Sequence, residues 1–200
     1  MESLDQSSDH PLVKRLYTSE TLAFAWHLWA ERERYLDVME QMPQTFCHLD
    51  SFRRNLFALR QRDGRQQTAA VDWAFSGIAP LGCDIAPLVW VSAIFQEITT
   101  DQIAALDKLA FQRYLEGLHN GGWKGDSRLI RLAYLIMALP NIAIPTEFLL
   151  FLDEKQHSRL EKGFGHNMTE IIDHWARLLT VAMRYADEFD QLLSEVDAAI

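Results

Sequence analysis

The fold of this chain is decided by residues 48–73, which read HLDSFRRNLFALRQRDGRQQTAAVDW. Residues 56–60 have the composition of a short strand, and the Asp-Gly pair that follows them is a turn signal. Residues 68–73 then read as the returning strand. The stretch therefore predicts a β-hairpin, with Asn55 just before its first strand and Asp72 at the end of its second.

A second pattern, H-x-D-x-x-x-x-N, runs from His48 through Asp50 to Asn55. In kinase catalytic loops the Asp of this pattern orients or accepts the proton of the substrate hydroxyl, and the Asn ligates magnesium. The spacing suits that chemistry because one loop can present both groups, and because hard oxygen ligands suit magnesium. The hairpin would return a second carboxylate, Asp72, beside Asn55. The alternative is structural: Asp50 caps a helix, Asn55 lies in a turn and Asp72 ends a strand.

Three segments in this order, HLDSFRRNLF, AAVDWAFSG and LGCDIAPLV, resemble the aminoglycoside phosphotransferase family, which has a protein-kinase-like fold. The resemblance implies an enzyme that depends on ATP and Mg²⁺ and transfers a phosphoryl group to a small-molecule hydroxyl. It implies that Asp50 is the catalytic base and that His48 braces the loop. By the same resemblance, Asn55 and Asp72 bind the Mg²⁺ that bridges the ATP phosphates.

Asp84 lies in the third of these segments. The resemblance implies that its carboxylate supports the catalytic loop by accepting backbone hydrogen bonds, a strong interaction for an ionised group. The alternative, equally open at this point, is that Asp84 caps a helix that begins at Ile85.

The chain before His48 departs from the family pattern. The family has a small N-terminal β lobe with a loop that covers the ATP phosphates and a Lys that pairs with them. Residues 1–47 contain no glycine, a single lysine (Lys14) and no series of strand patterns. A loop that approaches phosphates closely is hard to build without glycine. We therefore expect the large C-terminal lobe alone, with the N-terminal β lobe absent.

The rest of the chain reads as helical, with a polar arm at residues 1–17 and a shorter apolar piece at 144–154. Helices are expected near residues 18–42, 85–98, 99–118 and 128–139, and from 167 onward. Pro140 is expected to end the fourth helix, and an unbroken apolar stripe makes the last helix continuous. The expected fold class is mainly α with a small β-hairpin, in one domain over residues 1–200.

The apolar face of the first helix is expected to include Trp26, Trp29 and Leu36, because they fall in its run of hydrophobic positions.

The composition excludes several classes of protein. The 200 residues are 48% hydrophobic and 24% charged, with a formal net charge of −9, which is ordinary for a globular domain. Scattered Lys and Arg in an acidic chain argue against nucleic acid as a partner. The apolar runs are too short to span a bilayer, and the start lacks a signal peptide. Cys47 and Cys83 are expected to be buried thiols rather than a disulfide. We therefore expect a cytoplasmic protein.

Other candidate sites carry weaker signals. Three histidines fall at spacings that match no helical pair of metal ligands, and we expect no metal site from them: His157, His166 and His174. Three acidic residues could line a pocket for a cationic acceptor, with solvated helix surface as the alternative: Asp153, Glu154 and Glu161. Phe52 stands where protein kinases have a basic residue, so Arg53 or Arg54 is a candidate to reach the transferred phosphate.

Three functional hypotheses follow from these patterns. The first is a small-molecule kinase of the kind described above. The second is a catalytically inactive, truncated kinase-like lobe that acts as a binding module. The third is a helical interaction protein that associates with itself or with a partner through the face that an N-terminal lobe would cover.

Overall fold

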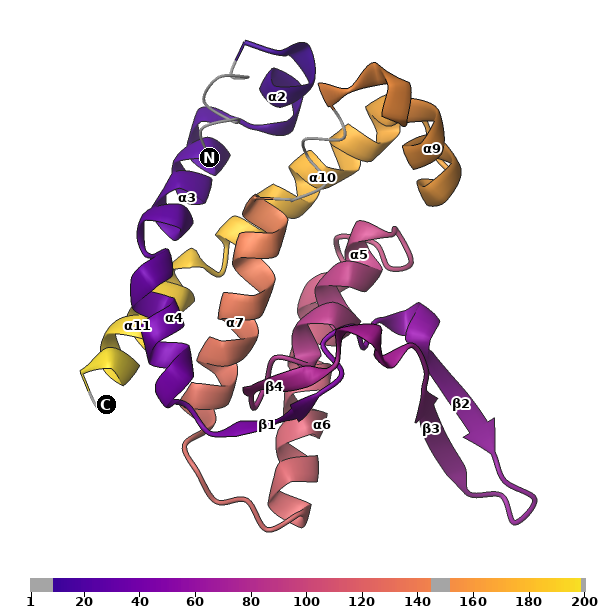
Figure 1. The fold of residues 1–200 in the computed structure, drawn as a ribbon, viewed down its shortest axis with the longest axis vertical. Coiled ribbons are helices and arrows are strands. Elements are labelled where there is room, and N and C mark those ends of the chain that lie inside the picture. The colour runs from indigo at the N-terminus through magenta and orange to yellow at the C-terminus, as the bar shows by residue number, and fades with distance from the viewer. Residues whose placement is uncertain (1–8, 145–151, 199–200) are drawn as a thin grey trace.

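The computed structural model describes residues 9–144 and 152–198. These residues form a mainly helical protein with two small antiparallel sheets (Figure 1). The predicted helical class and the hairpin are confirmed, and the second sheet was not predicted. Most of the apolar piece at 144–154 lies outside the described residues.

The N-terminal arm contains a helix that the sequence reading missed, α2 (Pro11–Leu16). Pro11 stands in its first turn, where a proline is well tolerated because the missing N–H has no partner in a helix. Val13 and Leu16 are buried, and Arg15 forms an ion pair with Asp173 at 2.6 Å. The arm is therefore packed against the body of the protein from residue 11 onward.

Helix α3 (Ser19–Ala30) begins where predicted because Thr18 caps it. The Thr18 hydroxyl accepts a hydrogen bond from the backbone N–H of Thr21 at 3.2 Å, and the Thr21 hydroxyl accepts one from the N–H of Thr18 at 2.9 Å. The predicted single helix is divided at Glu31, after which α4 (Arg32–Gln41) follows.

The expected apolar face of α3 and α4 is wrong at three positions. Trp26, Trp29 and Leu36 are 37%, 38% and 49% exposed, whereas Ala25 and Leu28 are fully buried. The apolar side chains occupy a wider arc of the helix surface than the part that packs against the core, so some of them remain exposed. Trp29 instead lies under the guanidinium of Arg32, 4.4 Å from the ring centre.

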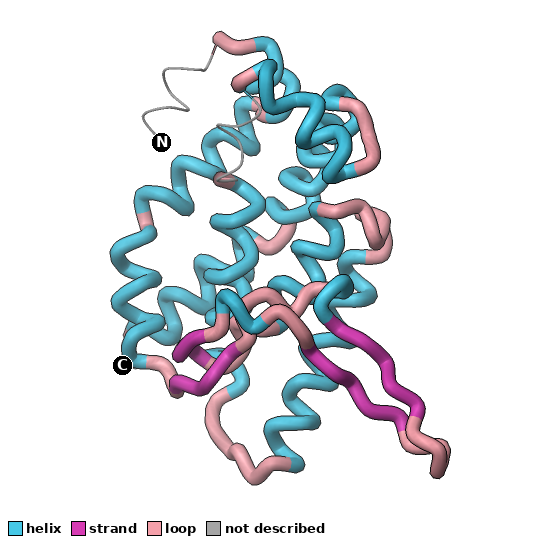
Figure 2. Tube along the Cα trace, turned by 45° about the vertical axis from the view of Figure 1, so that its right-hand side comes forward, coloured by secondary structure: helices cyan, strands magenta, loops and turns pink. Residues whose placement is uncertain are grey.

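The predicted hairpin consists of β2 (Leu56–Arg60) and β3 (Gln66–Ala70), paired from Leu56 with Ala70 to Arg60 with Gln66. Gly64 in its turn has a φ of 84°, a left-handed conformation that favours glycine. Figure 2 shows the hairpin extending away from the helices. The returning strand ends at Ala70, so Val71 and Asp72 follow it, whereas 68–73 was the expected extent.

The second sheet pairs β1 (Gln44–Cys47) with β4 (Gly77–Pro80). It joins the two ends of the segment that contains the hairpin, and Figure 1 shows it beside the lower half of α7. The loop that starts at His48 therefore leaves from a fixed strand.

The core is built around α7 (Ser127–Ala143), which has ten buried residues and lies among α3, α10 and α11. The expected end of this helix at Pro140 is wrong, because the helix continues for another three residues. The carbonyl of Met137 in the turn before Pro140 accepts a hydrogen bond from the side-chain amide of Asn141 at 2.6 Å. The N–H that Pro140 lacks would have bonded to the carbonyl of Ile136, four residues earlier, so the Asn141 bond to Met137 does not replace it.

Between the hairpin and α7 the chain forms a buried helical segment and a long amphipathic helix. They are η3 (Pro87–Val91), α5 (Ser92–Ile94) and α6 (Ile103–Asn120). Trp90 of η3 donates a hydrogen bond from its indole N–H to the hydroxyl of Tyr134 at 2.8 Å, inside the core.

The C-terminal part contains α9 (Glu154–Phe164), α10 (Met168–Met183) and α11 (Ala186–Asp197). The prediction of one continuous last helix is wrong, because the chain turns at Arg184 and Tyr185. The apolar stripe does not reveal this break, since it keeps its helical spacing through the turn. The turn brings α11 back beside α4 and α7 (Figure 1).

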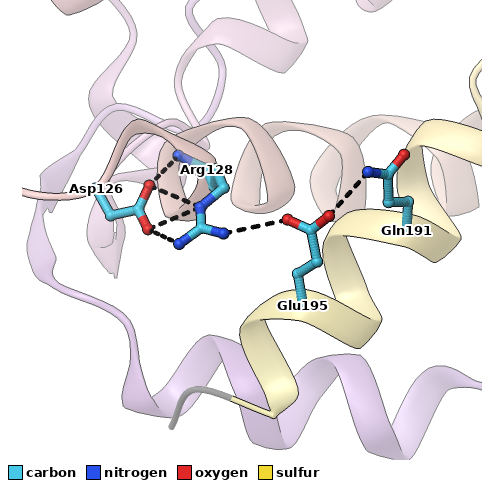
Figure 3. Close-up of polar contacts among 4 residues, drawn as sticks. All are labelled: Asp126, Arg128, Gln191 and Glu195. Carbon is cyan, nitrogen blue, oxygen red and sulfur yellow. Dashed lines mark hydrogen bonds and ion pairs between the residues drawn. The ribbon is translucent and has the colours of Figure 1, made fainter.

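A surface network joins the start of α7 to α11 (Figure 3). The Asp126 carboxylate caps α7 by accepting the backbone N–H of Arg128 at 2.9 Å, and it also pairs with the Arg128 guanidinium at 2.6 Å. The same guanidinium reaches Glu195 at 3.2 Å, and Glu195 accepts a hydrogen bond from Gln191. The network fixes the angle between the two helices at this end.

Two further expectations concern the chain as a whole. Cys47 and Cys83 are both buried and unbonded to each other, and burial raises the pKa of each thiol to about 12. Among the described residues, no helix combines the length and the apolar character that a membrane span requires.

Candidate functional site

The loop after β1 is held by the carboxylate of Asp84. One oxygen of Asp84 accepts the backbone N–H of His48 at 3.1 Å, and the other accepts the N–H of Leu49 at 2.7 Å. The carbonyl of Asp84 also accepts a hydrogen bond from the Ser51 hydroxyl at 2.6 Å. Both carboxylate oxygens are therefore used on the loop, and the N–H of Ile85 bonds to the carbonyl of Gly82 instead.

Leu49 has a φ of 62°, a conformation that costs a non-glycine residue about 1–2 kcal/mol. Strained backbone of this kind persists only where the surroundings fix it. Here the hydrogen bonds that the N–H groups of His48 and Leu49 donate to the Asp84 carboxylate supply that restraint. The strain turns the chain sharply just before Asp50.

His48 connects the loop to the residue that precedes Asp72. Its Nε2 lies 2.8 Å from the carbonyl oxygen of Val71, and its Nδ1 lies 3.3 Å from the backbone nitrogen of Asp50. A carbonyl only accepts and a backbone N–H only donates, so the neutral ring carries its proton on Nε2. The ring also packs against Trp73, with 4.6 Å between ring centres.

Asp50 and Asn55 form one hydrogen-bonded unit. The side-chain nitrogen of Asn55 donates to the Asp50 carboxylate at 2.8 Å and to the Asp50 carbonyl at 2.9 Å. Asn55 is buried, with 8% of its surface exposed. Both of its partners only accept, so the amide must turn its nitrogen toward Asp50 and its oxygen away.

Asp72 follows directly after the point where the hairpin is tied to the loop. The backbone N–H of Val71 donates to the carbonyl of Asn55 at 3.0 Å, while the Val71 carbonyl accepts from His48. Asp72 itself adopts a left-handed conformation, with φ 59° and ψ 68°. The structure thus gathers the backbone of His48, Asp50, Asn55 and Asp72 into one small region, with Asp84 beneath the loop.

The electrostatics of the region act on Asp50. Burial raises the pKa of its carboxyl above the ordinary value, the hydrogen bond from Asn55 and the nearby His48 oppose that rise, and the negative charge of Asp72 adds to it.

The predicted donor set for a metal consists of the Asn55 amide oxygen and the Asp72 carboxylate. Over residues 9–144 and 152–198, no group of three or more His, Cys, Asp and Glu side chains is placed to hold a metal ion. His174, one of the three histidines considered above, is buried and lies 2.6 Å from the carbonyl of Ala93. A hydrogen-bonding role in the core accounts for it.

The arginines beside the loop are placed differently from each other. Arg54 pairs with Glu97 at 2.6 Å and lies over the ring of Phe95, 4.4 Å from its centre. Its charge is therefore already neutralised. Arg53 is exposed, and its backbone is fixed by a bond from its N–H to the hydroxyl of Ser92 at 3.3 Å and by a bond from the N–H of Leu56 to its carbonyl. Ser51 and Ser92 were not singled out from the sequence, since single serines give no spacing signal.

A cavity of about 470 Å³ opens beside Asp50. Its walls come from η3, α5, α7, α9 and α10, while Leu49 and Asp50 form part of its lining. Three acidic residues that were candidates for a pocket do not line it: Asp153, Glu154 and Glu161. Asp153 caps α9 by accepting the N–H of Lys155, and Glu161 accepts the N–H of Met168.

Comparison with known protein families agrees with this geometry. A family model described as the phosphotransferase enzyme family matches residues 4–121, more than half of the chain. The chain belongs to the phosphotransferase enzyme family. The matched range contains the loop, the hairpin and Asp84, so the predicted kinship with aminoglycoside phosphotransferases is confirmed. No curated protein and no solved structure gives a significant match to the chain.

The match to the phosphotransferase family covers the loop and the hairpin, but only part of the cavity. The matched range ends at Gly121, after α6. The cavity walls supplied by α7, α9 and α10 lie beyond it. The family therefore indicates phosphotransferase activity, while the pocket next to Asp50 has to be understood from its own residues.

Proposed function

We propose that this protein transfers the terminal phosphoryl group of Mg²⁺-bound ATP to the hydroxyl of a small molecule. The observation that supports this most is the unit of Asp50 and Asn55, joined at 2.8 Å, on a loop that is tied to the residue before Asp72. A purely structural role would not explain why this carboxylate also lines a cavity.

In this proposal Asp50 orients the acceptor and takes its proton. The hydroxyl oxygen forms a bond to the γ-phosphorus of ATP, the bond from that phosphorus to the β–γ bridging oxygen breaks, and ADP leaves. The hydroxyl proton passes to the Asp50 carboxylate. Asp84 and His48 are positioning residues in this scheme, because they fix the loop and touch no reacting atom.

Asn55 and Asp72 would hold the Mg²⁺ ion. The Asn55 nitrogen is committed to Asp50, which leaves the amide oxygen for a metal. An amide oxygen and a carboxylate are the hard ligands that Mg²⁺ prefers, with water and phosphate oxygens completing its shell. The ion, when bound, would neutralise charge on the transferred phosphoryl group.

Two measurements test the proposal. ATP with Mg²⁺ at a hundredfold excess over its dissociation constant should raise the free energy of unfolding by about 2.7 kcal/mol. Asp72→Asn should remove this stabilisation, whereas Asp63→Asn, at an exposed carboxylate in the turn of the same hairpin, should retain it. Asp50→Asn should retain nucleotide binding and lower phosphoryl transfer by about 10²–10⁴-fold. Full transfer activity in Asp50→Asn would refute the role of Asp50.

A second candidate function is a non-catalytic interaction module. Phe46 and Ile78 face each other across the β1–β4 pair and are 60% and 70% exposed. Trp73 stacks on Phe46, with 5.9 Å between ring centres. The occupant that fits this patch is a second copy of the chain, since each described sheet has only two strands and leaves edges that can pair with their own counterparts. A strictly monomeric protein from micromolar to millimolar concentration would exclude this candidate.

A further inference from the structure

The cavity beside Asp50 has the size of a binding site for a small organic molecule. Its volume of about 470 Å³ falls within the range of roughly 300–1,000 Å³ that is usual for ligand pockets. Asp50 lies in its lining. A molecule in this cavity would therefore have direct access to the carboxylate that we propose as the base.

The lining of the cavity is almost entirely apolar. Five aromatic side chains contribute to it: Phe75, Trp90, Phe95, Phe164 and Trp175. Apart from the Trp indoles, the only polar side chains among the described lining residues are Asp50 and Asn141. The Trp90 indole N–H is already bonded to Tyr134, and the Asn141 nitrogen to the carbonyl of Met137.

This lining does not suit an acceptor that carries several positive charges. An ammonium group that leaves water for apolar surroundings loses its hydration, and only a paired carboxylate compensates for that loss. The described lining offers one carboxylate, Asp50, and that group is needed at the hydroxyl. The acidic residues Asp153, Glu154 and Glu161 are not in the lining, and Asp153 and Glu161 accept backbone hydrogen bonds at the ends of α9 instead.

A single quaternary ammonium group also fits poorly, even though it could in principle bind to aromatic faces. The ring of Phe95 already has the guanidinium of Arg54 4.4 Å from its centre. Phe164 is stacked against the same ring at 5.2 Å, and Trp175 meets Phe164 edge to face at 6.4 Å. Phe95, Phe164 and Trp175 thus form a packed column with a cation already on it, rather than an open cage.

From these observations we infer that the acceptor is a neutral, largely apolar alcohol, in which an aromatic or alicyclic ring carries a hydroxyl group. Its ring packs against Phe164 and Trp175, and its hydroxyl reaches Asp50. The inference rests on the proposed function, because the hydroxyl is the group phosphorylated there. The bonds made and broken are those given above, with ATP as the donor and ADP as the leaving group.

Binding can be measured without turnover. The probe is 2-(2-naphthyl)ethanol, compared with choline and with a tri-aminated aminoglycoside, each titrated against the full chain by calorimetry. The naphthyl alcohol should bind at least tenfold more tightly than either cation. Equal or tighter binding of choline or of the aminoglycoside would overturn the inference.

Three variants localise the binding. Phe164→Ala should weaken the naphthyl alcohol at least tenfold, and Ala138→Leu, which adds carbon atoms to the cavity wall, should do the same without leaving a void. Phe57→Ala, at a half-exposed hairpin position away from the cavity, is the matched control and should leave affinity unchanged. Affinity that is unaffected by both cavity variants would also overturn the inference.

The failure of this inference can be told apart from failure of the proposed function. If Mg²⁺–ATP stabilises the protein but the naphthyl alcohol neither binds nor accepts phosphate, the acceptor class is wrong and the kinase proposal stands. If the alcohol binds in the cavity but Mg²⁺–ATP gives no stabilisation, the cavity assignment is supported and the phosphorylation step is refuted.

Discussion

Replacing Asp84 by Asn should destabilise the protein by a predictable amount. The Asp84 carboxylate accepts two backbone N–H groups, at 3.1 Å from His48 and 2.7 Å from Leu49. Asparagine has one acceptor oxygen, so it can replace only one of these bonds and must turn its NH₂ group toward the other N–H. The variant keeps the shape of the side chain, so packing changes little.

The magnitude follows from the number of bonds lost. A hydrogen bond to a charged group contributes about 1.5–3 kcal/mol, so Asp84→Asn should lower the free energy of unfolding by that amount. Asp84→Ala removes both bonds and should cost about 3–6 kcal/mol by the same count. If Leu49 relaxes from its left-handed conformation in this variant, the relief of backbone strain offsets about 1–2 kcal/mol of the loss. Since domains are stable by only about 5–15 kcal/mol, the Asn variant is the safer one to measure.

The assay is urea unfolding followed by far-ultraviolet circular dichroism, which gives the midpoint and the slope of the transition. The matched control is Asp153→Asn. Asp153 is an exposed cap that accepts the N–H of Lys155 at 3.0 Å, and Asn caps helices about as well as Asp. We therefore expect a change within about 0.5 kcal/mol at Asp153. If Asp84→Asn costs no more than the control, the two bonds do not hold the loop and the reasoning is refuted.

Three more predictions use the same assay. Gly82→Ala should cost more than about 3 kcal/mol, since a Cβ there would clash with the backbone oxygen of Ile130. Gly117→Ala, in open helical space, should instead gain about 0.5–1 kcal/mol. Asp107→Ala should cost about 1–3 kcal/mol, because the largely buried Arg131 loses the partner at 2.7 Å and keeps Glu188 alone. His174 should make the fold sensitive to acid. Burial lowers its pKa from the ordinary 6.5, so stability is complete above pH 6.5 and declines as the pH falls toward the lowered value.

Each of these has a result that would contradict it. A Gly82→Ala protein as stable as the parent would mean that the close approach is absent. The control for Asp107→Ala is Glu116→Ala, which breaks an exposed ion pair with Arg113 and should cost less than about 1 kcal/mol. Equal losses of stability in the two variants would show that burial of the ion pair is irrelevant. His174→Gln should flatten the decline below pH 6.5, and an unchanged decline would place the acid sensitivity elsewhere.

The hairpin and the loop before it could be predicted from the sequence because their signals are local. The turn pair at Asp63 and Gly64 lies between two short strands, and both strands are within 15 residues of each other along the chain. The spacing from His48 to Asn55 is likewise contained in one loop. Signals of this kind depend on neighbouring residues alone, so they can be recognised without knowing how the rest of the chain packs.

The second sheet could not be predicted in the same way. β1 and β4 are four residues each, and the 29 residues 48–76 separate them along the chain. Neither shows a clear alternation, since Phe46 and Ile78 are apolar and yet point to solvent. Their pairing depends on how the hairpin and the loop that starts at His48 fold between them. That is tertiary information, which a short sequence pattern does not contain.

The helix boundaries failed where packing overrides a local rule. Pro140 lies inside α7 because buried residues on both sides of it, including Leu139 and Ile142, pack the helix into the core. The apolar stripe after Asn167 is continuous although the chain bends at Tyr185. The cavity was missed for a related reason: its walls come from five elements, and no single segment of sequence contains its pattern.

Three side-chain hydrogen bonds join the first helices to the last ones. Arg15 meets Asp173, His27 meets Asp190 and Arg34 meets Asp197, across separations of 158 to 163 residues. During synthesis on a ribosome, α3 and α4 would emerge long before these partners exist. The apolar face of α3 would stay uncovered until α7 and α10 followed, and that of α4 until α11 followed. A premature stop within α11 should therefore leave part of α4 uncovered, although α4 is among the first helices made.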